Sequence, residues 1–124
     1  MEVFFDTTKT GLETLMVAWR AEVLRYIWSR GGESFINREV WEHVSPLYGV
    51  SRTSINQFLK RLTEMGLLKN RPVTGRGGIH GNYSLKLSEE AFGRYVARTI
   101  LNKLLEVFPK EAGESIEEYC AKEK

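Results

Sequence analysis

The chain is poor in the residues from which disulfides, metal sites and catalytic centres are built. Its 124 residues include one cysteine (Cys120), two histidines (His43 and His80) and one aspartate (Asp6). A single cysteine excludes an intrachain disulfide framework and is typical of an intracellular protein. The histidines and the cysteine show no metal-ligand spacing, and no nucleophile has an adjacent general base. We therefore expect no enzyme activity, no metal and no cofactor.

Long apolar runs are also missing. No stretch of about 18 apolar residues occurs, so the sequence predicts no membrane span. The first residues lack the basic region and the long apolar stretch of a signal peptide. A chain of 14.3 kDa with 42% hydrophobic residues is long enough for one core and too short for two ordinary ones. We expect one compact domain in the cytoplasm.

Positive charge is concentrated in one window, although the formal net charge of the whole chain is only +2. Between residues 50 and 86 the only acidic side chain is Glu64, whereas residues 1–49 and 106–124 are each net acidic. Such a distribution is typical of a nucleic-acid-binding face, although charges that compensate one another in three dimensions would give the same pattern. The basic residues of the window are Arg52, Lys60, Arg61, Lys69, Arg71, Arg76 and Lys86.

Three predicted helix starts share one signature, a Ser or Asn cap placed between apolar residues. Asn37, Ser51 and Ser88 carry it, and they predict helices that begin near residues 38, 52 and 89. An earlier helix is expected over residues 11–30, because a glycine pair follows it. In the third helix, about 52–65, helical spacing gathers the apolar residues Ile55, Phe58, Leu59, Leu62 and Met65 on one arc.

Turn and strand signals surround these helices. Pro46 and Gly49 predict that residues 45–49 connect the second helix to the third. The segments 67–71 and 83–87 have the pattern of two antiparallel strands, and the glycine-rich stretch 72–82 between them predicts a loop. Residues 33–36 are expected to add a very short third strand.

The segment from Val50 to Asn70, VSRTSINQFLKRLTEMGLLKN, resembles the recognition helix and first wing strand of winged helix-turn-helix transcriptional regulators. Among these it is most similar to the penicillinase-repressor and MarR-type groups, and its RLTEMGLL stretch is the most specific part. The resemblance covers roughly Leu15 to Phe108. It implies a mainly α fold with a small β-hairpin wing (α+β) and terminal helices for dimerisation. The expected parts are an N-terminal arm (1–10), the winged helix-turn-helix domain (11–87, with the wing at about 67–87), a dimerisation helix (88–108) and an acidic tail (109–124).

The resemblance also implies contacts with double-stranded DNA. The recognition helix of such proteins enters the major groove, where Arg can bind guanine, Asn or Gln can bind adenine, and a Thr methyl can touch thymine. In the wing, Arg76 at the tip is expected to reach the minor groove. The alternative is that the helix has a merely solvated polar face and that the hairpin tip has no partner. The expected DNA-binding residues are Ser51, Arg52, Thr53, Asn56, Gln57, Lys60, Arg61, Arg71, Arg76, His80, Asn82 and Lys86.

The terminal helices carry more apolar surface than one core contact needs. The first predicted helix has two apolar stripes, and a helix of this kind is usually buried on two sides. We expect a homodimer through the first and last helices, unless both stripes are covered within one chain. The tail after Pro109 is expected to be only partly ordered, with a short helix near Ser115 if its capping-box spacing to Glu118 is used. The expected dimer residues are Val17, Leu24, Trp28, Val96, Ile100 and Leu104.

These observations favour a sequence-specific, dimeric DNA-binding repressor that acts on the nucleoid. Two other classes of function stay open at this point. One is a winged-helix module that binds proteins in a larger complex, and the other is an architectural DNA-binding protein without base discrimination. The sequence assigns no small-molecule effector.

Overall fold

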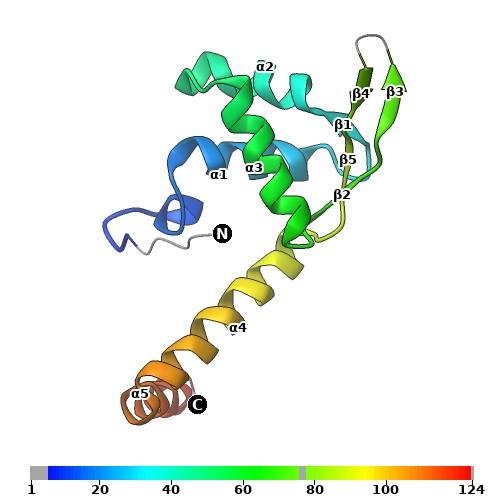
Figure 1. The fold of residues 1–124 in the computed structure, drawn as a ribbon. Helices are drawn as coiled ribbons and strands as arrows, with labels where there is room; N and C mark the ends of the chain where they lie inside the picture. Colours follow the sequence, from blue (N-terminus) through cyan, green and yellow to red (C-terminus); the bar gives the residue numbers. More distant parts are fainter. Residues whose placement is uncertain (1–5, 76–77, 124) are drawn as a thin grey trace. The chain divides into compact units, whose positions relative to one another are not determined.

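The computed structural model describes residues 6–75 and 78–123, with Ile79 and His80 described by their backbone alone. Two compact units follow one another along the chain, one that ends at Ser88 and one that begins at Glu89. The first holds three α-helices and a short 3-10 helix packed beside a small sheet (Figure 1). The second is a pair of helices. In the described part of the chain, no helix is both long and apolar enough to cross a bilayer.

The helices of the first unit enclose its hydrophobic core. They are the 3-10 helix η1 (Gly11–Thr14), α1 (Ala18–Ser29), α2 (Asn37–Tyr48) and α3 (Arg52–Glu64). Helix α1 packs on α2, and α2 packs on α3. The helix-turn-helix arrangement of α2 and α3 is therefore confirmed. The fully buried side chains of these helices are Ala21, Val23, Leu24, Ile27, Val40, Val44, Ile55, Phe58, Leu59 and Leu62.

A three-stranded antiparallel sheet lies beside the helices. Its strands are β1 (Phe35–Ile36), β2 (Leu68–Asn70) and β5 (Asn82–Leu85), in the order β1-β5-β2. Phe35 is the register partner of Tyr83, and their rings stack with centroids 6.0 Å apart. The short third strand expected at residues 33–36 is thus confirmed as β1.

The glycine-rich stretch between β2 and β5 is more ordered than a loop. Strands β3 (Val73–Gly75) and β4 (Gly78–His80) pair antiparallel, so the expectation of an irregular loop over 72–82 is wrong. Thr74 and Ile79 supply the β-branched residues that favour a strand in the middle of this pair. The hairpin extends beyond the three-stranded sheet (Figure 1), and its tip, residues 76–77, lies outside the described residues.

The expected single helix over 11–30 is wrong, because the chain is broken before α1. Leu15 N and Met16 N both donate hydrogen bonds to Leu12 O, which closes η1. Val17 then has an extended backbone, with φ −63° and ψ 152°, and α1 starts after it. The break allows Met16 to be buried, at 3% exposed, although it precedes the helix. The end of α1 at Ser29, just before Gly31 at φ 65°, agrees with the expected glycine stop.

Helix α2 departs from expectation at both of its ends. Ile36 and not Asn37 is the cap residue, and its backbone N–H donates to Glu39 Oε1 at 3.3 Å. Pro46 lies inside the last turn instead of ending the helix. Proline removes one helical hydrogen bond, and this loss is tolerated near the end, where Gly49 N donates to Ser45 O at 2.7 Å. The connection to α3 is therefore shorter than predicted, with Gly49 in the left-handed region at φ 64°.

The second unit consists of α4 (Glu89–Val107) and α5 (Pro109–Lys122), which pack on each other. The predicted start near residue 89 is confirmed. The prediction of a partly ordered tail is wrong, because Pro109 occupies the first turn of a 14-residue helix, where proline is favoured. Ser115 does not cap a later helix; its hydroxyl donates to Glu111 O at 2.9 Å within α5.

Candidate nucleic-acid interface

The N-terminus of α3 is built as the sequence predicts. Ser51 is the cap residue, and its Oγ accepts a hydrogen bond from Ser54 N at 3.1 Å. This bond satisfies one of the free backbone N–H groups at the start of the helix. The Ser51 hydroxyl is also within 3.0 Å of Ser54 Oγ. Ser51 therefore has a structural role in addition to its predicted place at the DNA interface.

Helix α3 has one buried face and one exposed polar face. The apolar side chains Ile55, Phe58, Leu59 and Leu62 are at most 2% exposed. The opposite face has no acidic residue before Glu64, the last residue of the helix. The structure thus places all the predicted contact residues of this helix on its exposed surface, namely Arg52, Thr53, Asn56, Gln57, Lys60 and Arg61.

Two of these side chains are held by residues of α2. The guanidinium of Arg52 lies over the ring of Trp41, with 5.8 Å between its Cζ and the ring centroid. Asn56 Oδ1 accepts a 2.7 Å hydrogen bond from Asn37 Nδ2. From its sequence context Asn37 was predicted only as a helix cap, and this bond was not predicted. Only the packing of α2 on α3 brings the two amides together, and no local pattern in the sequence signals it.

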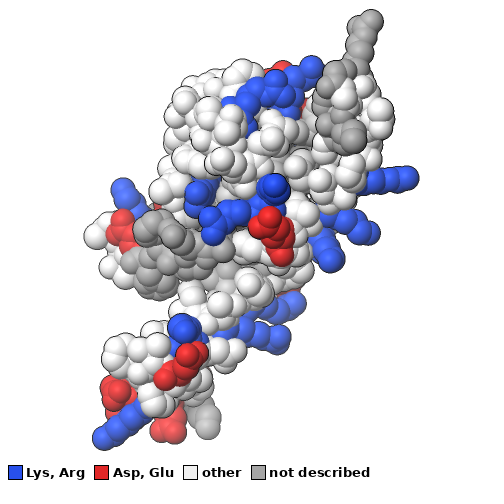
Figure 2. Space-filling model, in the orientation of Figure 1, with Lys and Arg blue, Asp and Glu red and all other residues white. Residues whose placement is uncertain are grey.

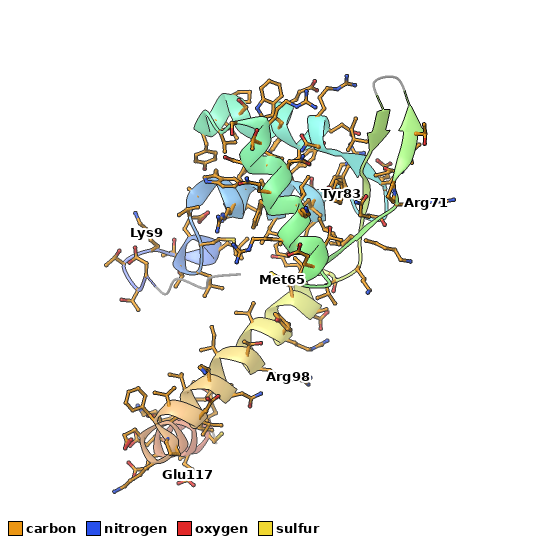
Figure 3. The ribbon with its side chains drawn as sticks, in the orientation of Figure 1. Lys9, Met65, Arg71, Tyr83, Arg98 and Glu117 are labelled. Carbon is orange, nitrogen blue, oxygen red and sulfur yellow. The ribbon has the colours of Figure 1, made fainter. Side chains whose placement is uncertain are left out.

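The wing contributes further basic side chains beside α3, which packs on β2. Lys69, Arg71 and Lys86 are exposed, and Asn82 is half-buried. Backbone bonds fix this region, because Arg71 N donates to Asn82 O and Lys86 N donates to Leu67 O, each at 2.8 Å. In Figure 3 the side chain of Arg71 points outward from the wing, whereas Tyr83 lies toward the helices.

Two predicted wing contacts have no structural description. Arg76 lies outside the described residues, and so does the side chain of His80. Among the described residues from 50 to 86, Glu64 is the only acidic one. Figure 2 shows Lys and Arg side chains over α3 and beside the strands on one visible face of the first unit. This electropositive surface is what a polyanion would require.

The titratable group inside the wing sheet is the phenol of Tyr83. Burial raises its pKa above the ordinary value of 10.0, because the charged phenolate is disfavoured away from water. Tyr83 is 6% exposed and stays neutral near pH 7. No group of three or more potential metal ligands occurs among the described residues.

The dimer residues expected from the sequence fall into two sets. Leu24 is fully buried and Val96 is 8% exposed within the single chain, so these two side chains have little surface left for a second chain. Leu24 already fills the core of the first unit. Val17 is 46% exposed and Leu104 is 44% exposed, whereas Trp28 and Ile100 are half-buried.

A groove along α4 and α5 was missed because the tail was not expected to be a full helix. Its volume is about 580 Å³. Ala112, Ile116 and Tyr119 have helical spacing, and with Pro109 at the helix start they are the signal that predicts this apolar stripe. The residues that line the groove are Leu101, Leu104, Phe108, Glu111, Ala112, Ser115, Ile116 and Tyr119.

Comparison with known proteins gives one family. The family model described as penicillinase repressor matches residues 18–120, which is most of the chain. A search of curated proteins gives no match. The matched range includes α1, the helix-turn-helix, the wing, α4 and nearly all of α5. The resemblance seen in the sequence is thus confirmed for the penicillinase-repressor group, and this chain belongs to that family of winged-helix, DNA-binding transcriptional repressors.

Proposed function

We propose that this chain is a sequence-specific repressor that binds duplex DNA as a homodimer in the cytoplasm. The observation that carries the proposal is the exposed polar face of α3, which has no acidic side chain before Glu64. A major groove about 12 Å wide admits one helix, and residues near the N-terminus of that helix reach base edges first. Arg52, Thr53 and Asn56 occupy these positions.

Phosphate binding is the role we propose for the wing. Arg71 and Lys86 are exposed beside α3, and neither has an ion pair with a described residue. Unpaired cations on one surface can neutralise phosphates and release counterions, which makes binding depend on salt. Such contacts position the protein on the duplex but carry no sequence information.

The proposed dimer interface is the groove of α4 and α5. Its apolar residues include Phe108, 55% exposed, and Tyr119, 66% exposed. Contiguous exposed apolar surface of this kind marks an interaction site. A second copy of this chain is the occupant we propose, because two recognition helices on one face of the DNA would read two half-sites. These half-sites would be spaced by about 34–36 Å, or a multiple of that distance.

The experiment measures the affinity for random duplex DNA across a salt series and then selects bound duplexes from a random pool. We expect the logarithm of the affinity to fall linearly with the logarithm of salt, with a slope of roughly −0.9 for each phosphate neutralised. We also expect a selected site to be bound at least about 1,000-fold more tightly than random DNA. Binding without a preferred site would indicate an architectural protein. No binding at all would indicate a module for protein interaction.

A further inference from the structure

The hydrogen bond between Asn37 and Asn56 joins the start of α2 to the exposed face of α3. Asn37 is the first residue of α2 and is half-buried, whereas Asn56 is exposed in the second turn of α3. The donor Nδ2 and the acceptor Oδ1 are 2.7 Å apart, at the short end of the usual range. It is a contact between two turns of the chain that are 19 residues apart.

An amide side chain reads a base differently depending on which of its atoms faces outward. The amide oxygen only accepts hydrogen bonds, whereas the amide nitrogen carries two N–H donors. Because Asn37 holds Asn56 Oδ1, the Asn56 amide has lost its free rotation. Its Nδ2 donates to no atom among the described residues, so both of its N–H groups are available to a ligand.

A second observation supports the direction of this bond. Asn37 Oδ1 is buried and has no hydrogen-bond partner among the described residues. With the reverse orientation of both amides, the buried orphan would be an N–H donor instead of a carbonyl oxygen. Buried carbonyl oxygens without a full set of partners occur more often in folded proteins than buried N–H groups without a partner, and a reversed Asn37 amide would bury two such N–H groups. The arrangement with Asn37 as the donor is therefore the favoured one.

We propose that Asn37 is a specificity-determining positioning residue, which contacts no base but fixes the amide of Asn56 so that its nitrogen faces the DNA. This inference rests on the proposed function, since it needs base readout by α3. The base that Asn56 meets should then present an acceptor in the major groove. Guanine O6 and N7, adenine N7 and thymine O4 are such acceptors, whereas the cytosine edge presents an N–H donor.

Two substitutions of Asn37 distinguish two effects of its hydrogen bond with Asn56. One effect is that the bond holds the Asn56 amide in place, and the other is that it fixes which amide atom faces outward. Asn37→Ala removes the donor and frees the Asn56 amide. Asn37→Asp offers only acceptor oxygens at neutral pH, so Asn56 is expected to turn its nitrogen toward residue 37 and its oxygen outward. The full-length protein and each variant are measured by fluorescence anisotropy on the selected duplex, on its single-base variants and on random duplex.

We expect Asn37→Ala to lower the preference at one base-pair position by roughly two- to tenfold, the range that corresponds to one net hydrogen bond. Affinity for random duplex should stay the same. We expect Asn37→Asp to change which base is preferred at that position, toward a base with an N–H donor. Leu47→Ala is the matched control, because Leu47 is an uncharged residue of the same helix and is 60% exposed. Circular dichroism melts of all the variants check folding.

The outcomes are distinct from those that test the proposed function. If the wild type selects a site and Asn37→Ala selects it equally well, the positioning role is wrong while sequence-specific binding stands. Equal losses of Asn37→Ala on the selected and the random duplex would also overturn the role, because a neutral substitution that affects both duplexes alike would indicate damage to the fold. If the wild type selects no site, the proposed function and this inference are both wrong.

Discussion

Arg52 lies over Trp41, with its guanidinium carbon 5.8 Å from the centroid of the indole ring. The indole is itself fixed, because Trp41 Nε1 donates a 3.1 Å hydrogen bond to Val50 O in the connection between α2 and α3. A cation over an aromatic face is attracted by the electron density of the ring. The contact thus orders a predicted DNA-binding side chain from the neighbouring helix.

Substitution of Trp41 tests this ordering. Trp41→Phe keeps an aromatic face but loses the N–H donor, and we expect it to lower the free energy of unfolding by about 1 kcal/mol. Trp41→Ala also removes the ring, so it should in addition weaken DNA binding more than the Phe variant does. Denaturant melts and duplex titrations measure the two effects. Equal DNA affinity of the Phe and Ala variants would show that the ring does not position Arg52.

The N-terminal cap of α3 gives a second prediction. Ser51→Ala removes the acceptor for Ser54 N and should destabilise the protein by about 1 kcal/mol. Ser51→Asp restores an acceptor and should recover most of that loss. The free energy of unfolding from urea melts decides between the variants. A Ser51→Asp variant that is as unstable as Ser51→Ala would contradict the capping role of this side chain.

The wing and the recognition helix should respond differently to alanine substitution. Arg71→Ala should weaken binding to all duplexes about equally and reduce the magnitude of the salt slope by about 1. Gln57→Ala should instead relax the preference for the selected site. Both residues are exposed, so neither change is expected to alter stability by more than about 0.5 kcal/mol. Matching profiles for the two variants would contradict the division between phosphate and base contacts.

High pH should destabilise the wing sheet through Tyr83. The pKa of this phenol is raised by burial above its ordinary value of 10.0, so above that pH the unfolded chain loses its proton more readily than the folded one. The contribution of the neutral Tyr83 phenol to the free energy of unfolding is fully present below pH 10 and is lost as the pH rises further. Tyr83→Phe should remove this part of the decline in the free energy of unfolding, measured between pH 8 and pH 11. Tyr48→Phe, at an exposed tyrosine of α2 outside the proposed interface, is the matched control for the substitution itself.

The α4–α5 groove supplies a prediction for the dimer. Leu104→Glu puts a charge on the apolar surface and should shift the protein from dimer to monomer in sedimentation experiments. Asn102→Glu makes the same change in charge at an exposed polar position of α4 and should leave the dimer intact. Loss of the dimer should also weaken binding to a two-half-site duplex. A wild type that is monomeric at all concentrations would contradict the proposed interface.

Local sequence signals were sufficient to predict helix α3 and the strands of the three-stranded sheet. Ser51, the apolar spacing from Ile55 to Leu62 and the glycine that follows define α3 to within one residue of the observed Arg52–Glu64. These signals work because capping and amphipathic burial are set by neighbouring residues. The same reasoning predicted β2, β5 and the short β1.

The incorrect predictions have two causes. Either packing between residues far apart in the sequence determined the structure, or a residue that usually ends a helix was tolerated inside one. The apolar spacing from Leu12 onward looked like one helix, but burial of Met16 is achieved with an extended Val17. Pro46 was given too much weight, because a proline in the last turn removes only one hydrogen bond. The hydrogen bond between Asn37 and Asn56 depends on how α2 packs on α3, and no single stretch of the sequence predicts that packing.

We propose that α3 and the wing lie against duplex DNA. Hydrogen exchange of the full-length protein with and without its selected duplex tests this claim directly. We expect added protection in α3 (Arg52–Glu64), in β2 (Leu68–Asn70) and in β5 (Asn82–Leu85), with little added protection in α2 beyond its first turn. Protection confined to α4 and α5, with α3 exchanging as fast as in the free protein, would contradict it.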